Sequence, residues 1–377
     1  ARTDAKFNEH EYYSFAEIHA DPLALDGVSC TLCHQIQPDN LGQEESFTGG
    51  YHIIDEYSIF GPYQNPTTTP MANQTGFTPV YSDHIRISEL CATCHTLFTP
   101  FVDDDGNVAG TFPEQVPYLE WQNSIYPAEG TGCQTCHMPA VDEALKIAGR
   151  PPWLSTLRKP VWKHDFVGAN IYMLNLIKDN AGTIGAAASD VHFDSTLAKS
   201  ERSLNGTVQL KAEANIIKDT LFVNVNVKNL AGHKFPTGFP SRRAWLRLTV
   251  KNNANETVFE SGQWNAAGEI IGLDENFEPH HNVIFSENQV QIYQAIMGDV
   301  NGDVTYTLLR GAKYLKDNRL PPVGFKSLGE NYEAMQIAGK AQNDPNFNKS
   351  NGTEGNGSDE VIYKITVDTS KDHTVVV

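Results

Sequence analysis

All six cysteines of this 377-residue chain fall in one five-residue pattern, C-x-x-C-H, which occurs three times. The copies are Cys30-Thr31-Leu32-Cys33-His34, Cys91-Ala92-Thr93-Cys94-His95 and Cys133-Gln134-Thr135-Cys136-His137. This is the attachment motif of c-type haem, in which both thiols bond to the porphyrin and the following histidine binds the iron. One turn of helix places the two sulfurs and the imidazole on the same side. The pattern predicts three covalent haem c groups, with His34, His95 and His137 as proximal ligands.

Zinc and disulfide bonds are the rival uses of so many cysteines. Structural zinc usually takes four ligands, often from two C-x-x-C pairs, so three pairs leave one pair without a partner. Disulfides could use all six cysteines. Neither alternative explains why a histidine directly follows every second cysteine, so the haem interpretation is favoured.

The net charge of −18 disfavours binding to nucleic acid or to an anionic membrane, because both need basic patches. An acidic surface suits positively charged redox partners, although it also simply favours solubility. No stretch approaches the roughly 20 apolar residues that a membrane-spanning helix needs. Because c-type haem is attached outside the bacterial cytoplasm, we expect an exported protein, periplasmic or extracellular, whose signal peptide has been removed.

The first part of the chain, residues 1–203, is expected to be a loop- and helix-rich trihaem domain. Short helices are predicted around each motif, over Pro117–Ser124, over 166–178 and over 189–203. The run Asp103–Asn107 is typical of a hairpin turn, since its glycine is misplaced for a calcium loop. Turn-forming residues are common between these elements, so the haems themselves are expected to supply much of the core.

After Asn205-Gly206 the hydrophobic period changes to two, which is typical of half-buried antiparallel strands. The alternating runs are 208–214, 221–227, 244–250 and 361–367. Several such strands predict an antiparallel β-sandwich domain over 204–377 and give the whole chain an α+β class. The segment Asn343–Asp359 is dense in Asn, Gly and Ser and is predicted to be a surface loop.

Over Ser14–Asn170 the motifs resemble the bacterial and archaeal multihaem c-type cytochromes. In that family a histidine upstream of C-x-x-C-H often binds the second axial position of an iron. The resemblance implies distal ligands at His19 in SFAEIHA, at His84 before SELC, and at His164 in the H-x-F-x-G stretch HDFVG. His233 in AGHKFPTG is a further candidate, for which the alternative is a turn histidine bonded to the backbone. His280 and His281 lie in a polar stretch and are expected to be exposed or interfacial.

The family resemblance implies an electron-transfer protein whose irons are mostly held by two histidines and which works with redox partner proteins. Some members assemble into filaments, so a homo-oligomer or filament is a further expectation. The alternative is a reductase of a small nitrogen or sulfur oxyanion with one open haem site. The carrier is favoured because all three motifs carry histidine and no dense cluster of Arg, Lys and Tyr indicates an anion pocket. A third interpretation makes the β-domain a binding module and the haems secondary.

Overall fold

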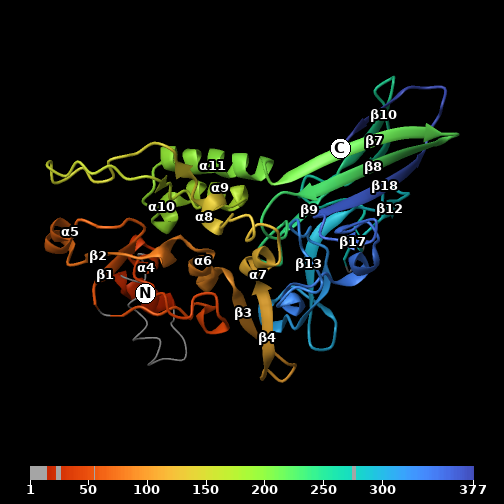
Figure 1. Cartoon of the computed structure of the whole chain (residues 1–377). Coiled ribbons are helices and arrows are strands. Elements are labelled where there is room, and N and C mark those ends of the chain that lie inside the picture. The colour runs from red at the N-terminus through yellow and green to blue at the C-terminus, as the bar shows by residue number, and fades with distance from the viewer. Residues whose placement is uncertain (1–14, 23–26, 55, 274–276) are drawn as a thin grey trace. The chain divides into compact units, whose positions relative to one another are not determined.

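The computed structural model describes residues 15–22, 27–54, 56–273 and 277–377 (Figure 1). The chain divides into two compact units. The motif unit comprises Ala1–Cys94 and Gly132–His164, and the sheet unit comprises His95–Thr131 and Asp165–Val377. Helices and strands are both present, in agreement with the expected α+β class. The predicted domain boundary is a single cut at residue 204, whereas each of these units is made of two separate stretches of the chain. That boundary stays a prediction.

The motif unit consists of short helices, turns and two small sheets. Its elements are α2 (Phe15–Ala20), α4 (Cys30–Cys33), η1 (Glu44–Ser46), β1 (Ser58–Gly61), α5 (Thr68–Thr75), β2 (Thr78–Tyr81), η2 (Asp83–Arg86), α6 (Ser88–His95), α8 (Cys133–His137), β5 (Ala140–Val141) and β6 (Val161–Trp162). Strand β1 pairs with β2 in parallel, and β5 pairs with β6 antiparallel. Each C-x-x-C-H motif lies on or at the end of its own short helix, as predicted.

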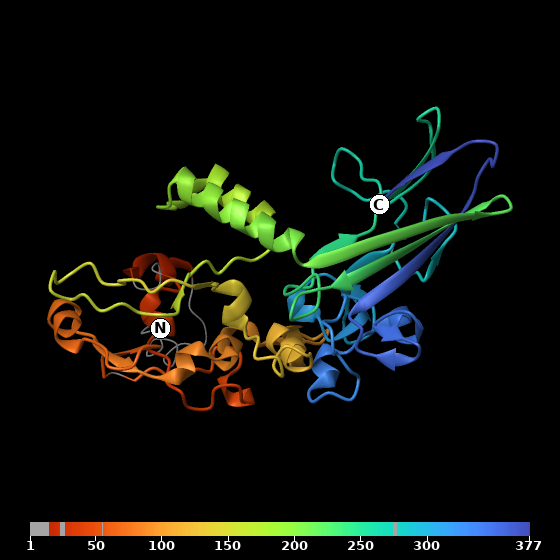
Figure 2. The ribbon, with the colours of Figure 1, turned by 45° about the horizontal axis from the view of Figure 1, so that its top comes forward.

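The sheet unit begins with the β3–β4 hairpin and a group of helices. These elements are β3 (Leu97–Val102), β4 (Val108–Gln115), α7 (Pro117–Gln122), α9 (Ile171–Asp179), α10 (Ala181–Ile184) and α11 (Asp190–Asn205). The hairpin turn over Asp103–Asn107 is confirmed, because the Asp103 N–H donates to the Asn107 carbonyl at 2.9 Å. Helix α9 begins later than predicted, because the Asn170 side chain accepts from the Met173 N–H and caps the first turn. Figure 2 shows α11 running directly into strand β7.

The remaining elements of the sheet unit are mostly strands. They are β7 (Val208–Ile217), β8 (Thr220–Asn229), β9 (Arg243–Trp245), β10 (Leu248–Asn252), β11 (Thr257–Ser261), β12 (Val283–Ile284), β13 (Ile292–Gly298), β14 (Val304–Thr305), η3 (Leu308–Arg310), β15 (Lys313–Asp317), η4 (Tyr332–Met335), η5 (Gly339–Asn343), β16 (Lys349–Ser350), β17 (Thr353–Glu354), β18 (Ser358–Thr366) and β19 (His373–Val376). None of the described helices is long and apolar enough to cross a bilayer.

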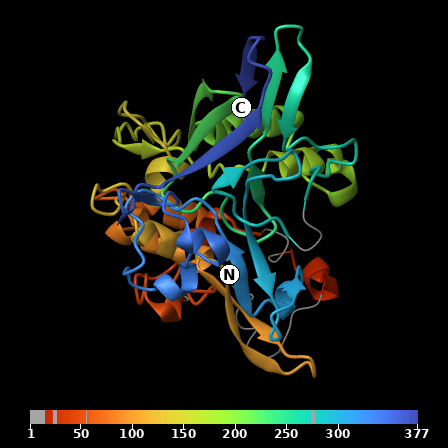
Figure 3. The same ribbon diagram turned by 90° about the vertical axis from the view of Figure 1, so that its right-hand side faces the viewer.

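Two of the sheets carry most of the predicted alternation. One sheet has the strand order β12-β18-β8-β7. The other has the order β11-β10-β19, and its three strands lie side by side in Figure 3. On β8 and β18 every second residue is buried, and Phe259 of β11 packs edge-on against Tyr363 of β18 with ring centroids 6.3 Å apart. The predicted half-buried strands at 221–227 and 361–367 are therefore confirmed. The run 208–214 is also a strand, but its side chains are exposed on both faces, and the arrangement as a β-sandwich stays a prediction.

The run 244–250 forms two strands where one was predicted. Strand β9 pairs with β13, whereas β10 pairs with β11 and β19, so the chain changes sheets at Leu246-Arg247. Gly262 makes this crossing feasible: its φ is +80°, and a Cβ on it would lie 2.2 Å from the Leu246 carbonyl oxygen.

The surface-loop prediction for Asn343–Asp359 is wrong for much of the segment. The segment contains the β16–β17 hairpin and the start of β18, and Phe347 and Asp359 are fully buried. The Asn348 side chain donates to the Phe325 carbonyl at 2.9 Å and accepts from the Gly357 N–H at 3.2 Å. Asparagine is common in surface loops, but the side-chain amide of Asn348 forms hydrogen bonds to buried backbone groups.

Candidate functional site

The first motif holds its histidine in a fixed orientation. Helix α4 is a single turn, in which the His34 N–H donates to the Cys30 carbonyl at 3.1 Å, so that Cys30, Cys33 and His34 lie within one helical turn. The His34 Nδ1 atom lies 2.6 Å from the carbonyl oxygen of Phe60 on β1. A carbonyl can only accept, so Nδ1 carries the hydrogen and Nε2 carries the lone pair. That is the tautomer a metal-binding imidazole needs.

The His164 imidazole lies opposite that of His34 within the motif unit. The two ring centroids are 6.2 Å apart and the ring planes differ by 27°. The His164 Nδ1 is 3.2 Å from the Trp162 carbonyl oxygen, at the end of β6, so His164 has the same tautomer as His34. Two metal–imidazole bonds of about 2 Å and two ring radii of about 1 Å come to roughly 6 Å. The separation therefore fits two imidazoles that share one metal ion between them.

The second and third motifs are packed against each other. The Cys133 N–H donates to Ser88 Oγ at the start of α6, at 3.1 Å. Gln134 Nε2 donates to the Ile87 carbonyl at 2.7 Å and lies 3.8 Å from Cys91 Sγ. None of the six cysteines, all of them described, forms a disulfide in the structure.

The thiols of all three motifs perturb one another. A hydrogen bond between Cys91 and Cys133 raises the pKa of Cys91 and lowers that of Cys133. Burial raises the pKa of Cys33, and the neighbouring Cys94 raises it further. Attachment points that are separated by up to about 60 residues in sequence, such as Cys33 and Cys94, thus lie within electrostatic range of one another.

His84 is placed differently from His164. It is buried and lies edge-on to Phe60, with ring centroids 4.7 Å apart. Its Nδ1 is 2.6 Å from Ser82 Oγ and its Nε2 is 2.8 Å from the Ile36 carbonyl oxygen. Burial lowers the pKa of this imidazole, so the neutral form is favoured. To bind iron through Nε2, His84 would have to give up its hydrogen bond to the Ile36 carbonyl. Its role as a distal ligand stays a prediction.

The other histidines of interest are spread over both units. His19 lies on α2, and its side chain is outside the described residues. His95 ends α6 and His137 ends α8. His233 follows β8 in the sheet unit, where its Nδ1 lies 3.2 Å from the Lys234 carbonyl oxygen and its own carbonyl accepts from Asn229 Nδ2. That environment matches the turn-histidine alternative, while ligation by His233 stays a prediction.

A second histidine cluster was missed by sequence reasoning. His280 is buried rather than exposed, which corrects the expectation for this residue. Among the described residues, His280, Asp344 and Asp359 form the grouping whose ligand atoms are close enough to hold a metal ion, within 4.8 Å of one another. The carboxylates come from 64 and 79 residues further along the chain, so no local motif could indicate them.

The hydrogen bonds around His280 argue against a metal there. The Gln291 and Asn318 amides both direct an NH₂ group at His280 Nδ1, at 2.9 and 3.0 Å. Their oxygens are held by the backbone N–H groups of His281 and Gln294, which fixes both amides in this orientation. Nδ1 is therefore the acceptor, and Nε2 carries the hydrogen that it donates to Asp344 at 3.1 Å. The ring offers no lone pair to a metal, and the cluster is a buried structural network.

Comparison with known proteins gives one likeness of fold. No family model and no curated protein matches the chain. Its structure is similar to the crystal structure of a penta-haem cytochrome c552 from Thermochromatium tepidum, with a TM-score of 0.51 and 16% sequence identity, over 95% of this chain and 71% of the other. At this identity the likeness shows that the chain shares the fold of a multihaem c-type cytochrome.

Proposed function

We propose that this chain is an electron-transfer protein that carries three covalent haem c groups. The pairs Cys30 and Cys33, Cys91 and Cys94, and Cys133 and Cys136 would hold the porphyrins, and His34, His95 and His137 would bind the irons. The proposal is supported by the three motifs, by their proximity in the motif unit and by the fold shared with a multihaem cytochrome. Bound at these residues, haem would supply a one-electron iron couple, which is the chemistry that electron transfer needs.

The observation that carries this proposal is the opposed pair of imidazoles, His34 and His164. Each donates Nδ1–H to a backbone carbonyl, which orients the ring and makes Nε2 the basic nitrogen. We propose that this pair holds the iron of the first motif from both sides. An iron that keeps two strong ligands in both oxidation states has no open position for a substrate, which favours a carrier over a reductase. His19, His84 and His233 remain the proposed distal ligands for the other two irons.

The spin state of the iron in the ferric holoprotein tests this function. Six-coordinate iron with two imidazoles is low-spin, so electron paramagnetic resonance should show low-spin signals alone. A high-spin fraction that responds to nitrite, sulfite or cyanide would instead support the reductase alternative. Replacing His19, His84 and His233 singly with alanine would then assign the remaining positions, because loss of a ligand converts one iron to high-spin.

The setting of the protein is proposed on the same basis. A haem c protein is expected in the periplasm or outside the cell, exchanging electrons with redox partner proteins. We further propose that residues 1–203 carry the haems and that residues 204–377, with their sheets, form a docking or assembly domain. Filament formation is a separate proposal, which negative-stain microscopy of the concentrated holoprotein tests: globular particles alone would count against it.

A further inference from the structure

Strand β7 is a long edge strand that no proline and no β-bulge interrupts. It lies at the end of the order β12-β18-β8-β7, and within the described residues it pairs with β8 alone. All ten of its residues pair with β8 in one unbroken register, Val208↔Asn229 to Ile217↔Thr220. Proline and β-bulges, which natural edges use to prevent association, are both lacking in this strand.

The hydrogen-bond pattern shows which backbone groups face outward. The Leu230 N–H donates to the Thr207 carbonyl at 2.8 Å, and this pair continues the β7–β8 register by one step. In an antiparallel pair, bonded positions alternate along each strand. The odd-numbered residues of β7 therefore bond to β8. The even-numbered residues, from Val208 to Ile216, direct their N–H and C=O groups away from the sheet.

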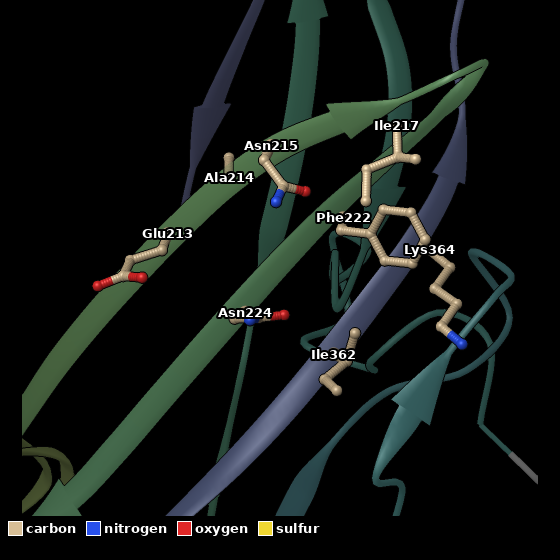
Figure 4. Close-up of a pocket in the computed structure, with 8 residues that line it drawn as sticks. All are labelled: Glu213, Ala214, Asn215, Ile217, Phe222, Asn224, Ile362 and Lys364. Atoms are coloured by element: carbon tan, nitrogen blue, oxygen red, sulfur yellow. The ribbon is translucent and has the colours of Figure 1, made fainter.

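From Leu210 to Ile216, the side chains of these even-numbered residues are apolar and exposed. Leu210, Ala212, Ala214 and Ile216 stand beside Val227, Val225, Val223 and Leu221 of β8, which are buried. Leu210 and Ile216 are nevertheless 43% and 45% exposed. The buried face of the sheet thus continues onto β7 without a covering layer. On the opposite face, Glu213, Asn215 and Ile217 line a hollow of about 430 Å³ with β8 and β18 (Figure 4).

The charges on β7 complement a second copy of the same strand in one register. The two charged residues of β7, Lys211 and Glu213, are both exposed and lie on one face. An antiparallel pairing with Ala212 opposite Ala212 places Lys211 of each copy opposite Glu213 of the other. Shifting the centre by one residue places Lys211 opposite Lys211, or Glu213 opposite Glu213, and like charges in direct opposition are destabilising.

The register centred on Ala212 also meets the other two requirements of the strand. It makes the even-numbered residues the bonded positions, as their outward backbone groups demand. It overlaps the strands from Val208 to Ile216, which is more than the registers centred further along the strand allow. On the apolar face, Leu210 of one copy meets Ala214 of the other, so a large side chain faces a small one.

We propose that β7 pairs antiparallel with β7 of a second copy about a two-fold axis through Ala212, joining the two four-stranded sheets edge to edge. The pairing is isologous, so it closes into a dimer and does not by itself build a filament. It rests on the sheet unit alone and does not depend on the proposed haem chemistry.

Sedimentation velocity of the holoprotein over a range of concentrations tests the dimer. The wild type should dimerise reversibly. Lys211→Glu and Glu213→Lys should each raise the dissociation constant about tenfold or more, because each creates two like-charge oppositions across the axis. The double exchange Lys211→Glu with Glu213→Lys should restore the wild-type constant. A mixture of the two single variants should form a heterodimer, because every opposed pair is then of opposite charge.

Two further variants keep the test decisive. Ala212→Pro removes an outward N–H without touching the β8 ladder, so it should give a folded monomer. Lys340→Glu, an equal change of charge on the exposed part of η5, should leave the dissociation constant unchanged. A wild type that stays monomeric at the highest soluble concentration would overturn the proposal. So would a double exchange as weak as the single variants, since that result would exclude the register centred on Ala212.

Discussion

At the residue scale, the proposed function rests on how two imidazoles are held. His34 is oriented by the Phe60 carbonyl and His164 by the Trp162 carbonyl, so both present Nε2 as the basic nitrogen. Both acceptors are backbone atoms, and any residue could supply them. Sequence reasoning therefore identified His34 from its motif and His164 from a family resemblance, but had no means of finding the groups that orient them.

Replacing His164 with alanine is expected to leave all three haems attached and to convert one third of the iron from low-spin to high-spin. The covalent bonds come from the cysteines, whereas His164 would supply an axial bond only. Electron paramagnetic resonance of the ferric protein measures the fraction, and a pyridine haemochrome assay checks the haem content. His192→Ala on α11 is the control, since that ring is exposed and bonds to Ser189 Oγ at 3.2 Å. An unchanged spectrum in His164→Ala would exclude the proposed axial pair.

A buried lysine gives the sheet unit a defined pH dependence. Lys316 is 1% exposed, and burial lowers its pKa to about 7. Its Nζ donates to the Glu278 and Ile292 carbonyls at 2.6 and 3.0 Å. Between pH 7 and its ordinary pKa near 10.5, the unfolded chain binds a proton that the folded chain has released. The free energy of unfolding should therefore rise with pH in this window, by up to about 1.4 kcal/mol per pH unit from this group.

Lys316→Met is expected to remove that rise. The substitution also removes the Lys316 hydrogen bonds to the Glu278 and Ile292 carbonyls, of which Ile292 keeps its bond from Asn318 Nδ2. The variant should therefore be less stable overall, and the slope against pH is the informative quantity. Urea denaturation at several pH values between 7 and 10 measures it. Lys340→Met is the matched control, because that side chain is exposed. If the slopes of Lys316→Met and the wild type coincide, Lys316 is charged throughout the range in the folded protein.

At the element scale, hydrophobic period predicted which segments are strands but not how they pair. Alternation continues through residues 244–250, yet β9 belongs to one sheet and β10 to another. The period of two holds on β10, where every second residue is buried, whereas Ala244 and Trp245 of β9 are both half-buried. The choice of sheet depends on partners far along the chain, such as β13, which no local pattern indicates. His280 and Asp344 are likewise far apart in sequence, by 64 residues. Because the partners of His280 lie so far along the chain, the local polar sequence did not indicate that this histidine is buried.

The crossing between the sheets gives a matched pair of glycine substitutions. Gly262 and Gly268 have nearly the same φ, +80° and +81°, but a Cβ on Gly262 would clash with the Leu246 carbonyl whereas Gly268 has open space. Gly268→Ala should cost about 1 kcal/mol, from backbone strain alone. Gly262→Ala should cost at least about 3 kcal/mol, because the chain must also move at the crossing. Equal losses in urea denaturation would mean that the close approach to Leu246 does not constrain the fold.

At the scale of the whole molecule, charge is the property that the sequence determines most directly. The net charge of the polypeptide is −18, and the propionates of the proposed haems would add to it. A charge of this size raises the local concentration of cationic partners and lowers that of anionic ones. The effect weakens as salt is added, because the Debye length falls from about 30 Å at 0.01 M to about 10 Å at 0.1 M.

Oxidation of the reduced holoprotein by two small reagents of opposite charge measures this field directly. Stopped-flow rates with the hexaammineruthenium(III) cation should fall as ionic strength rises, whereas rates with the ferricyanide anion should rise. Between 0.01 and 0.1 M salt each rate should change by about tenfold, in opposite directions. The two reagents serve as controls for each other, since an effect of salt on the fold or on the haem potentials would not reverse with the charge of the oxidant. If both rates moved in the same direction, the haems would exchange electrons through a surface that does not share the negative charge of the whole chain, and cationic partners would lose their expected advantage.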